Sequence, residues 1–403
     1  MTALTALVLA RPNALDREVG AFSAHALLSR PSFDLIDPSR AAAAAHLEQT
    51  QVLLWIAVTA LQIGVLAWFW SSGGSAALRD ALRLRMRSEF RVRFYFGACV
   101  ALLDKIVALA PLAMQYRFLR IMGLTEQLFR AWLAQWVLGT IVAILAAGLM
   151  AAAVLWLADR THQWYLYTLA AIMALTLVAA YAAPLFALPP LQEAALTRTL
   201  SGDVAALRMR TGIRTPVLEQ RIASRTRLAT AYVAGLGASQ RIVVSDTMLA
   251  GQSEPEMRFV IARAMAWIAA NDALHLALVQ AAFIVVSAAF AVAVSDRIGF
   301  RRDDDPVSRL AVLGAVIGLT YLLVMPFYNA YSRNLDVAVD QQALAITHDP
   351  ASAIRMQVRR ADQALLSACP GTIAKWYLTP HPAPGPRISA LQGAADACAM
   401  RRR

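Results

Sequence analysis

Residues 52–70 read VLLWIAVTALQIGVLAWFW, a stretch that contains no charged side chain. A helix of about 20 apolar residues is long enough to cross the ~30 Å hydrocarbon core of a bilayer. Trp68 and Trp70 end the stretch with side chains that favour the membrane–water interface. Five further apolar stretches follow, at about 94–116, 134–157, 164–187, 273–295 and 307–328. The sequence therefore predicts a multi-pass membrane protein with about six spans.

The composition of the 403 residues supports this class. Hydrophobic residues make up 59% and charged residues 16%, with a mean hydropathy of +0.51, whereas soluble domains have about 45–50% and about 25%. The net charge of +12 is carried almost entirely by arginine. Arginines that flank spans explain it, and no basic motif interleaved with aromatic residues indicates nucleic-acid binding. We expect membrane lipid as a partner, no nucleic acid, and a bacterial-type inner (plasma) membrane.

Two polar segments interrupt the spans. The strings TAYVAG and QRIVVSDTML on either side of Gly235-Leu-Gly237 predict a β-hairpin, and Ser253-Glu254-Pro255-Glu256 predicts a helix start. An even number of crossings separates the two segments, so they share a membrane face. The predicted division is a lead-in at 1–50, about four spans at 51–187, a polar segment at 188–271, two spans at 272–329 and a second polar segment at 330–403.

Two groups of residues have open interpretations. Cys99, Cys369 and Cys398 lack CxxC spacing, and we expect all three to be free thiols. Asp104 and Lys105 interrupt the second span. They either belong to a functional site, as in a transporter or channel, or are structural polar groups that face the bundle interior or a water-filled cavity.

Five strings occur in a specific order along the chain. They are RFLRIMGLTEQLFRAWLAQWVLG at 117–139, YAAPLFALPPL at 181–191, ATAYVAGLGASQRIVVSDTML at 229–249, SRNLDVAVDQQAL at 332–344 and HPAPGPRI at 381–388. This set resembles the integral-membrane CAAX prenyl protease (type I) family of zinc metallopeptidases. The resemblance implies a mainly α membrane helical bundle with a gluzincin-like peptidase domain that contains a small β-hairpin or sheet. It also implies that an extended substrate pairs with an edge strand.

The zinc-binding helix of such a peptidase carries HExxH, in which two histidines bind the metal and the glutamate is the general base. No HExxH occurs here; the matching helix reads FVIARAMAW at 259–267. The resemblance places Arg263 and Trp267 at the two histidine positions, Ala264 at the base and Asp336 at the third ligand. Arginine and tryptophan do not bind zinc and alanine takes no proton, so we expect no metal and no cofactor.

Other positions of the cleft follow from the resemblance. Thr230 takes the place of an edge-strand asparagine, Tyr232 follows it on that strand, and Asp340 lies one helical turn after Asp336. His381 and Arg387 match residues near the substrate, although a packing role for His381 is an equal alternative. Arg263 either pairs with Asp336 or extends to water. The two aspartates either carry out acid–base chemistry or form a solvated or ion-paired face.

The leading functional hypothesis is a non-catalytic relative, a pseudopeptidase that binds a peptide or protein at its edge strand. The alternative is an active membrane metalloendopeptidase with an unorthodox metal site. Such a site would draw on His275, His348 or His381, although no two of these have ligand spacing. His25, His46 and His162 lie outside the two polar segments.

Two features of the sequence predict opposite membrane orientations. The loop at 71–93 is rich in arginine, and so is the loop at 296–306. The positive-inside rule places these loops inside and the two polar segments outside. The family resemblance implies the opposite face for the polar segments, and we take that face as the expectation.

Overall fold

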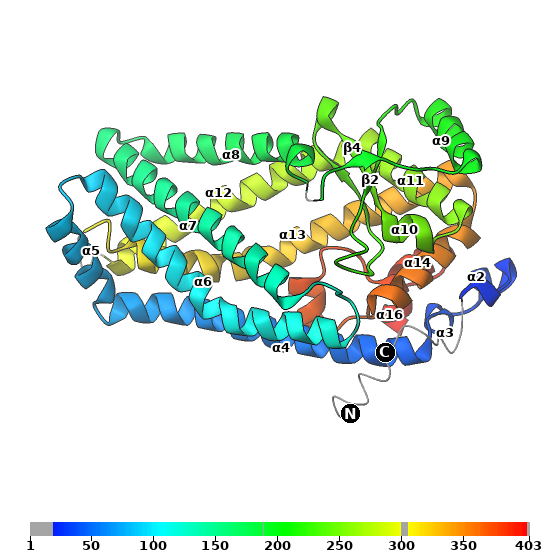
Figure 1. The fold of residues 1–403 in the computed structure, drawn as a ribbon, viewed down its shortest axis with the longest axis horizontal. Helices are drawn as coiled ribbons and strands as arrows, with labels where there is room; N and C mark the ends of the chain where they lie inside the picture. Colours follow the sequence, from blue (N-terminus) through cyan, green and yellow to red (C-terminus); the bar gives the residue numbers. More distant parts are fainter. Residues whose placement is uncertain (1–18, 188, 300–304, 401–403) are drawn as a thin grey trace.

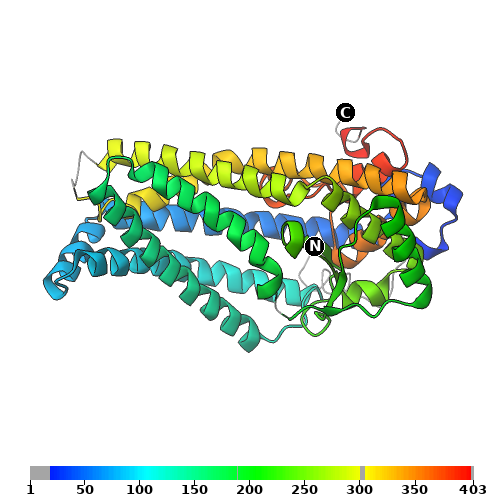
Figure 2. The same cartoon turned by 90° about the horizontal axis from the view of Figure 1, so that it is seen from above.

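A computed structural model of the chain describes residues 19–187, 189–299 and 305–400. The first part of the expected lead-in and part of the second arginine-rich loop lie outside these residues. Within them, six helices are long and apolar enough to cross a membrane. They lie side by side along the long axis of the molecule (Figures 1 and 2): α4 (Pro38–Ser71), α6 (Glu89–Ile121), α7 (Phe129–Arg160), α8 (Trp164–Ala182), α12 (Asp272–Gly299) and α13 (Leu310–Thr347).

Side chains on the outer surface of the bundle are apolar. Leu138 on α7 is 60% exposed, and Leu175 and Val178 on α8 are 64% and 61% exposed. These helices satisfy their backbone hydrogen bonds internally, so their exposed faces suit contact with lipid tails. The predicted mainly α, multi-pass membrane bundle is confirmed.

Helices α6 and α7 approach each other closely because glycines lie at their contact. A Cβ atom at Gly97 would be 2.6 Å from the Cβ atom of Ala151, and one at Gly148 would be 2.7 Å from the carbonyl oxygen of Phe94. Small residues at such crossings allow close backbone packing between membrane helices. Any larger side chain would push this pair apart.

Asp104 and Lys105 form a local polar contact inside the bundle. The side-chain amide of Gln62, on α4, donates to Oδ2 of Asp104 at 3.0 Å, and Nζ of Lys105 lies 3.6 Å from the same oxygen. These contacts connect α4 with α6 and give the charged groups partners. The geometry therefore favours a structural role for the pair, and it offers no support for a transport pathway.

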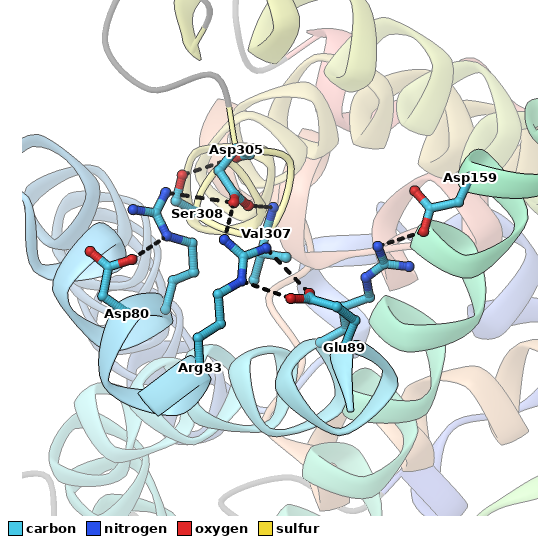
Figure 3. A network of polar contacts seen from close by, with 9 residues as sticks. Asp80, Arg83, Glu89, Asp159, Asp305, Val307 and Ser308 are labelled. Atoms are coloured by element: carbon cyan, nitrogen blue, oxygen red, sulfur yellow. Dashed lines mark hydrogen bonds and ion pairs between the residues drawn. The ribbon is translucent and has the colours of Figure 1, made fainter. Parts of the chain in front are cut away.

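The helix bundle has one arginine-rich end, which includes α5 (Gly74–Arg85) and the start of α6. Figure 3 shows its ion pairs: Arg83 contacts both Glu89 and Asp305, and Arg93 contacts Asp159. Arg83 lies on α5, Asp159 lies near the end of α7 and Asp305 precedes α13, so these pairs join α5, α6 and α7 with the segment before α13. The remaining elements lie at the opposite end (Figure 1).

At that opposite end a small sheet has the strand order β1-β2-β4-β3. Strand β3 runs antiparallel to β4, and β2 runs parallel to β4. The predicted hairpin is thus confirmed, and β3 is an edge strand. The strands are β1 (Gln192–Glu193), β2 (Val217–Gln220), β3 (Ala231–Ala234) and β4 (Arg241–Ser245).

Helix α11 (Glu254–Ala269) is the centre of this polar end. Its predicted start is confirmed, because Ser253 and Glu256 form a reciprocal capping box. Phe259, Ile261 and Met265 are completely buried in one core against the sheet and the later helices. The surrounding helices are α9 (Arg198–Thr211), α10 (Asp246–Gly251), α14 (Pro350–Ala364), α15 (Pro384–Leu391) and α16 (Ala397–Met400).

Short elements complete the polar end. The chain enters through short helices that pack against α14 and α15, and a single π-helical turn follows α14. These short elements are η1 (Val19–Ala21), α2 (Ala24–Ser29), α3 (Ser32–Leu35), η2 (Ala183–Phe186), η3 (Gly237–Ser239) and η4 (Ala374–Leu378).

The expectation that Cys369 and Cys398 are free thiols was wrong. Cys369 and Cys398 form a disulfide with their Cα atoms 5.5 Å apart, and only Cys99 is free. The two cysteines lie 29 residues apart in sequence. Spacing alone gave no sign of the bond, because the two cysteines flank α15 in sequence and meet only in the folded chain.

Candidate functional site

Helices α11 and α13 face each other at the polar end, and one arginine bridges them. Asp336 and Asp340 lie one helical turn apart, so both carboxylates point from the same face of α13. Arg263 on α11 donates from Nε to Oδ1 of Asp340 at 2.8 Å and from Nη2 to Oδ1 of Asp336. Of the two alternatives for Arg263, the structure shows the pairing with Asp336, and the same guanidinium also binds Asp340.

Two further residues complete the contacts of the aspartates. Arg387, at the start of α15, donates to both oxygens of Asp340, with both distances 2.7 Å. Nδ1 of His381 lies 2.7 Å from Oδ2 of Asp336. Both oxygens of each carboxylate thus have a partner. This excludes the alternative of a solvated acidic face.

The two carboxylates and Arg387 are desolvated, whereas the side chain of Arg263 is 21% exposed and that of His381 is 62% exposed. Asp336, Asp340 and Arg387 are each no more than 3% exposed. Burial by itself lowers the pKa of Arg263, but the charges and hydrogen bonds of Asp340 and Asp336 outweigh burial and raise it overall. Charged hydrogen bonds between a guanidinium and carboxylates are strongest in such a setting. Arg263 therefore stays charged and holds α11 to α13.

A cavity of about 450 Å³ lies between the edge strand β3 and this cluster. Its surface is mostly apolar, with charged groups gathered on one wall. Tyr232 of β3 contributes to it while its hydroxyl contacts Oε1 of Gln220 at 3.0 Å. The lining includes Arg263, Ala264, Trp267, Asp336, Arg360, His381 and Arg387.

Most of the predicted site residues meet at this cavity, and two do not line it. Thr230 directs its backbone toward Ser245, with hydrogen bonds of 3.0 and 2.9 Å, and it precedes the edge strand. Asp340 lies behind Arg263 as a buried partner. The structure also adds Arg360 of α14 to the site. No separate signal in the sequence pointed to Arg360, because it follows Arg359 in an ordinary amphipathic helix.

The residues present do not fit a zinc ion. Zinc sites need three or four nitrogen, sulfur or carboxylate ligands around one point. In the described part of the chain, no three His, Cys, Asp or Glu residues converge in this way. Asp336 is the single coordinating side chain among the four expected metal-site positions, and both of its oxygens are engaged. His275 has only a 3.9 Å contact with Asp272.

Comparison with known proteins explains the layout. The sequence model of peptidase family M48 matches residues 190–395, and that of the CAAX prenyl protease N-terminal region, five membrane helices, matches residues 37–193. The chain belongs to peptidase family M48. The M48 match contains the sheet, the α11–α13 cluster and most of the residues that line the cavity, so the cluster lies in the peptidase region of the family.

Two individual proteins support the assignment. "Uncharacterized metalloprotease YhfN" of Bacillus subtilis is 26% identical over 185 residues, which span 43% of this chain and 42% of that protein. The crystal structure of S. mikatae Ste24p superimposes with a TM-score of 0.73 and covers 96% of this chain and 98% of its own. At 15% identity, the second comparison shows a shared fold.

Proposed function

We propose that this M48 protein is a pseudopeptidase, which uses the family's chamber to bind a polypeptide and does not cut it. The observation that carries the proposal is the ion-paired cluster of Arg263, Asp336 and Asp340. Hydrolysis by this family's chemistry needs a metal-bound water and a general base. The expected base position is Ala264, which has no group that can accept a proton.

Peptide binding is supported by the features that the chamber retains. Strand β3 pairs with β4 on one side, and its other edge belongs to the cavity wall. An extended chain can add to such an edge through main-chain hydrogen bonds, while side chains enter neighbouring pockets. Trp267 and the apolar lining of the cavity suit aliphatic side chains. The alternative of an active enzyme with a relocated metal gains no support from the placement of the histidines.

A photo-crosslinking residue at Tyr232 should capture polypeptide in native membranes. Tyr232 is 41% exposed at the cavity, so a benzophenone side chain there reaches a chain that lies along β3. The matched control is Met209 on α9, which is 82% exposed and does not line the cavity. We expect discrete adducts, identified by mass spectrometry, from position 232 only. Equal adducts at both positions would contradict a specific edge-strand site.

We further infer that the cavity faces the extracytoplasmic side. Arginines gather at the α5 end of the bundle, which the positive-inside rule assigns to the cytoplasm. The disulfide between Cys369 and Cys398 lies at the opposite end, and disulfides persist in oxidising compartments. Charge and redox chemistry therefore agree. This orientation is the reverse of the one that the family resemblance implies.

Cysteine labelling tests the orientation directly. In a Cys99→Ser background, Ser201→Cys on α9 should react with a membrane-impermeant maleimide in intact bacterial cells. Ala81→Cys on α5 should react only after lysis. Both positions are exposed to solvent, so the difference reports the membrane face alone. Labelling of Ala81→Cys but not Ser201→Cys in intact cells would establish the opposite orientation.

A further inference from the structure

The charged wall of the cavity has a surplus of positive charge. Three arginines, Arg263, Arg360 and Arg387, lie around two carboxylates, Asp336 and Asp340. Arg263 and Arg387 each donate two hydrogen bonds to the carboxylates. His381 adds at most one more positive charge when it is protonated. Arg360 is therefore the cation whose charge the cluster does not balance.

Arg360 has no hydrogen bond or ion pair with another described residue. Its neighbour Arg359 contacts Glu256 at 3.3 Å, and Arg258 contacts Asp349 at the same distance. Arg360 lines the cavity beside β3 and also a second cavity of about 240 Å³ that reaches toward α4. Arg360 thus lines both cavities, the second together with Glu48, whose Oε1 accepts a hydrogen bond from the backbone N–H of Gly371.

The surroundings of Arg360 are partly buried and positively charged. Burial, followed by the positive charges of Arg387 and Arg263, lowers the pKa of Arg360 to about 10. The side chain still carries its charge at neutral pH. Fewer water molecules screen an ion pair at this partly buried place than in bulk water, so an incoming anion would gain more from the charge of Arg360.

We propose that Arg360 is a binding site for a carboxylate of the polypeptide held in the cavity. The proposal rests on the proposed function for the polypeptide itself. A guanidinium presents two parallel N–H donors that match the two oxygens of a carboxylate. The cluster lacks one negative charge, which a monoanion supplies, whereas a phosphate dianion would also be repelled by Asp336 and Asp340. The carboxylate belongs either to a chain terminus or to an Asp or Glu side chain.

Chemical modification of the purified protein tests the site without a known ligand. Phenylglyoxal, which attacks guanidinium groups, should modify Arg360 faster than the ion-paired Arg263 and Arg387, as measured by peptide mass spectrometry. N-acetylalanine should slow the reaction at Arg360 at least several-fold, and N-acetylalaninamide should not. Equal protection by both compounds, or protection by inorganic phosphate alone, would overturn the carboxylate site.

Two peptide pools link the site to the proposed function. The pools are random pentapeptides that lack Asp and Glu and differ only in a free or amidated C-terminus, and retention is measured by affinity-selection mass spectrometry. A third, amidated pool with one Asp or Glu distinguishes a side-chain carboxylate from a terminal one. A charged hydrogen-bonded pair contributes about 1.5–3 kcal/mol, so a pool with the right carboxylate should be retained about 10- to 100-fold better.

Matched variants show whether a negative result contradicts the carboxylate site or the peptide-binding function. Arg360→Gln should abolish the preference and leave the thermal midpoint unchanged or higher, because it removes a charge without a partner. Arg355→Gln changes the same charge on the same helix at a residue that lines neither cavity, and it should keep the preference. Retention of all pools without preference overturns the carboxylate site alone. Retention of none, with Arg360 still protected by N-acetylalanine, overturns the peptide-binding function alone.

Discussion

Asp340→Asn should destabilise the protein by about 3–5 kcal/mol, the range found when one partner is removed from a buried ion pair. Asp340 is 3% exposed and accepts hydrogen bonds from both Arg263 and Arg387. The substitution keeps the size of the side chain but leaves two guanidiniums around the single charge of Asp336. The measurement is the free energy of unfolding in detergent from a denaturant titration.

A second substitution tests whether the stability lost in Asp340→Asn comes from the unbalanced positive charge or from the lost contact. Arg263→Met in the Asp340→Asn background removes one positive charge and should recover part of the lost stability, giving a coupling energy above about 0.5 kcal/mol. Asp203→Asn on α9 is the control, because Asp203 lies away from the cluster, and it should change stability by less than about 0.5 kcal/mol. A loss of the same size for Asp203→Asn and Asp340→Asn would show that the cluster has no special role.

Restoring the four family positions should create a zinc site. The variant Arg263→His, Ala264→Glu, Trp267→His and Asp336→Glu places HExxH on α11 opposite a longer carboxylate on α13. The ion pair between Arg263 and Asp336 already shows that these two positions reach each other. Three such ligands and a water make up the usual catalytic zinc site. We expect about one zinc per chain in the variant and no stoichiometric zinc in the natural protein.

The zinc content of the purified protein and its free energy of unfolding both report whether the zinc site forms. Zinc at 100 times its Kd should stabilise the fourfold variant by about 2.7 kcal/mol, and a chelator should reverse the effect. The matched control carries Trp267→Ala in place of Trp267→His and lacks one ligand. Stoichiometric zinc in the natural protein would overturn the pseudopeptidase proposal. A folded fourfold variant that binds no zinc would show that the helices have moved from the family's geometry.

The sequence predicted the parts of this protein that depend on neighbouring residues. Uncharged runs such as 52–70 predict membrane helices because the bilayer core excludes charge. The capping box at Ser253 and the turn between β3 and β4 are likewise local, and the structure confirms both. The boundary between the last membrane span and the acidic helix that follows it was not determined by local sequence. The last span and the acidic helix form a single helix, α13, which continues through Pro326.

Only the tertiary structure decided which charged groups meet. Arg263 binds aspartates that lie 73 and 77 residues later in the chain, and the disulfide closes across α15. Arg360 belongs to the cavity because of the way α14 packs beside α11. Such contacts depend on the angles and distances between packed helices, which the side chains of one segment do not determine. The sequence thus determined the membrane helices and the absence of HExxH, and the packing determined the cluster found at those positions.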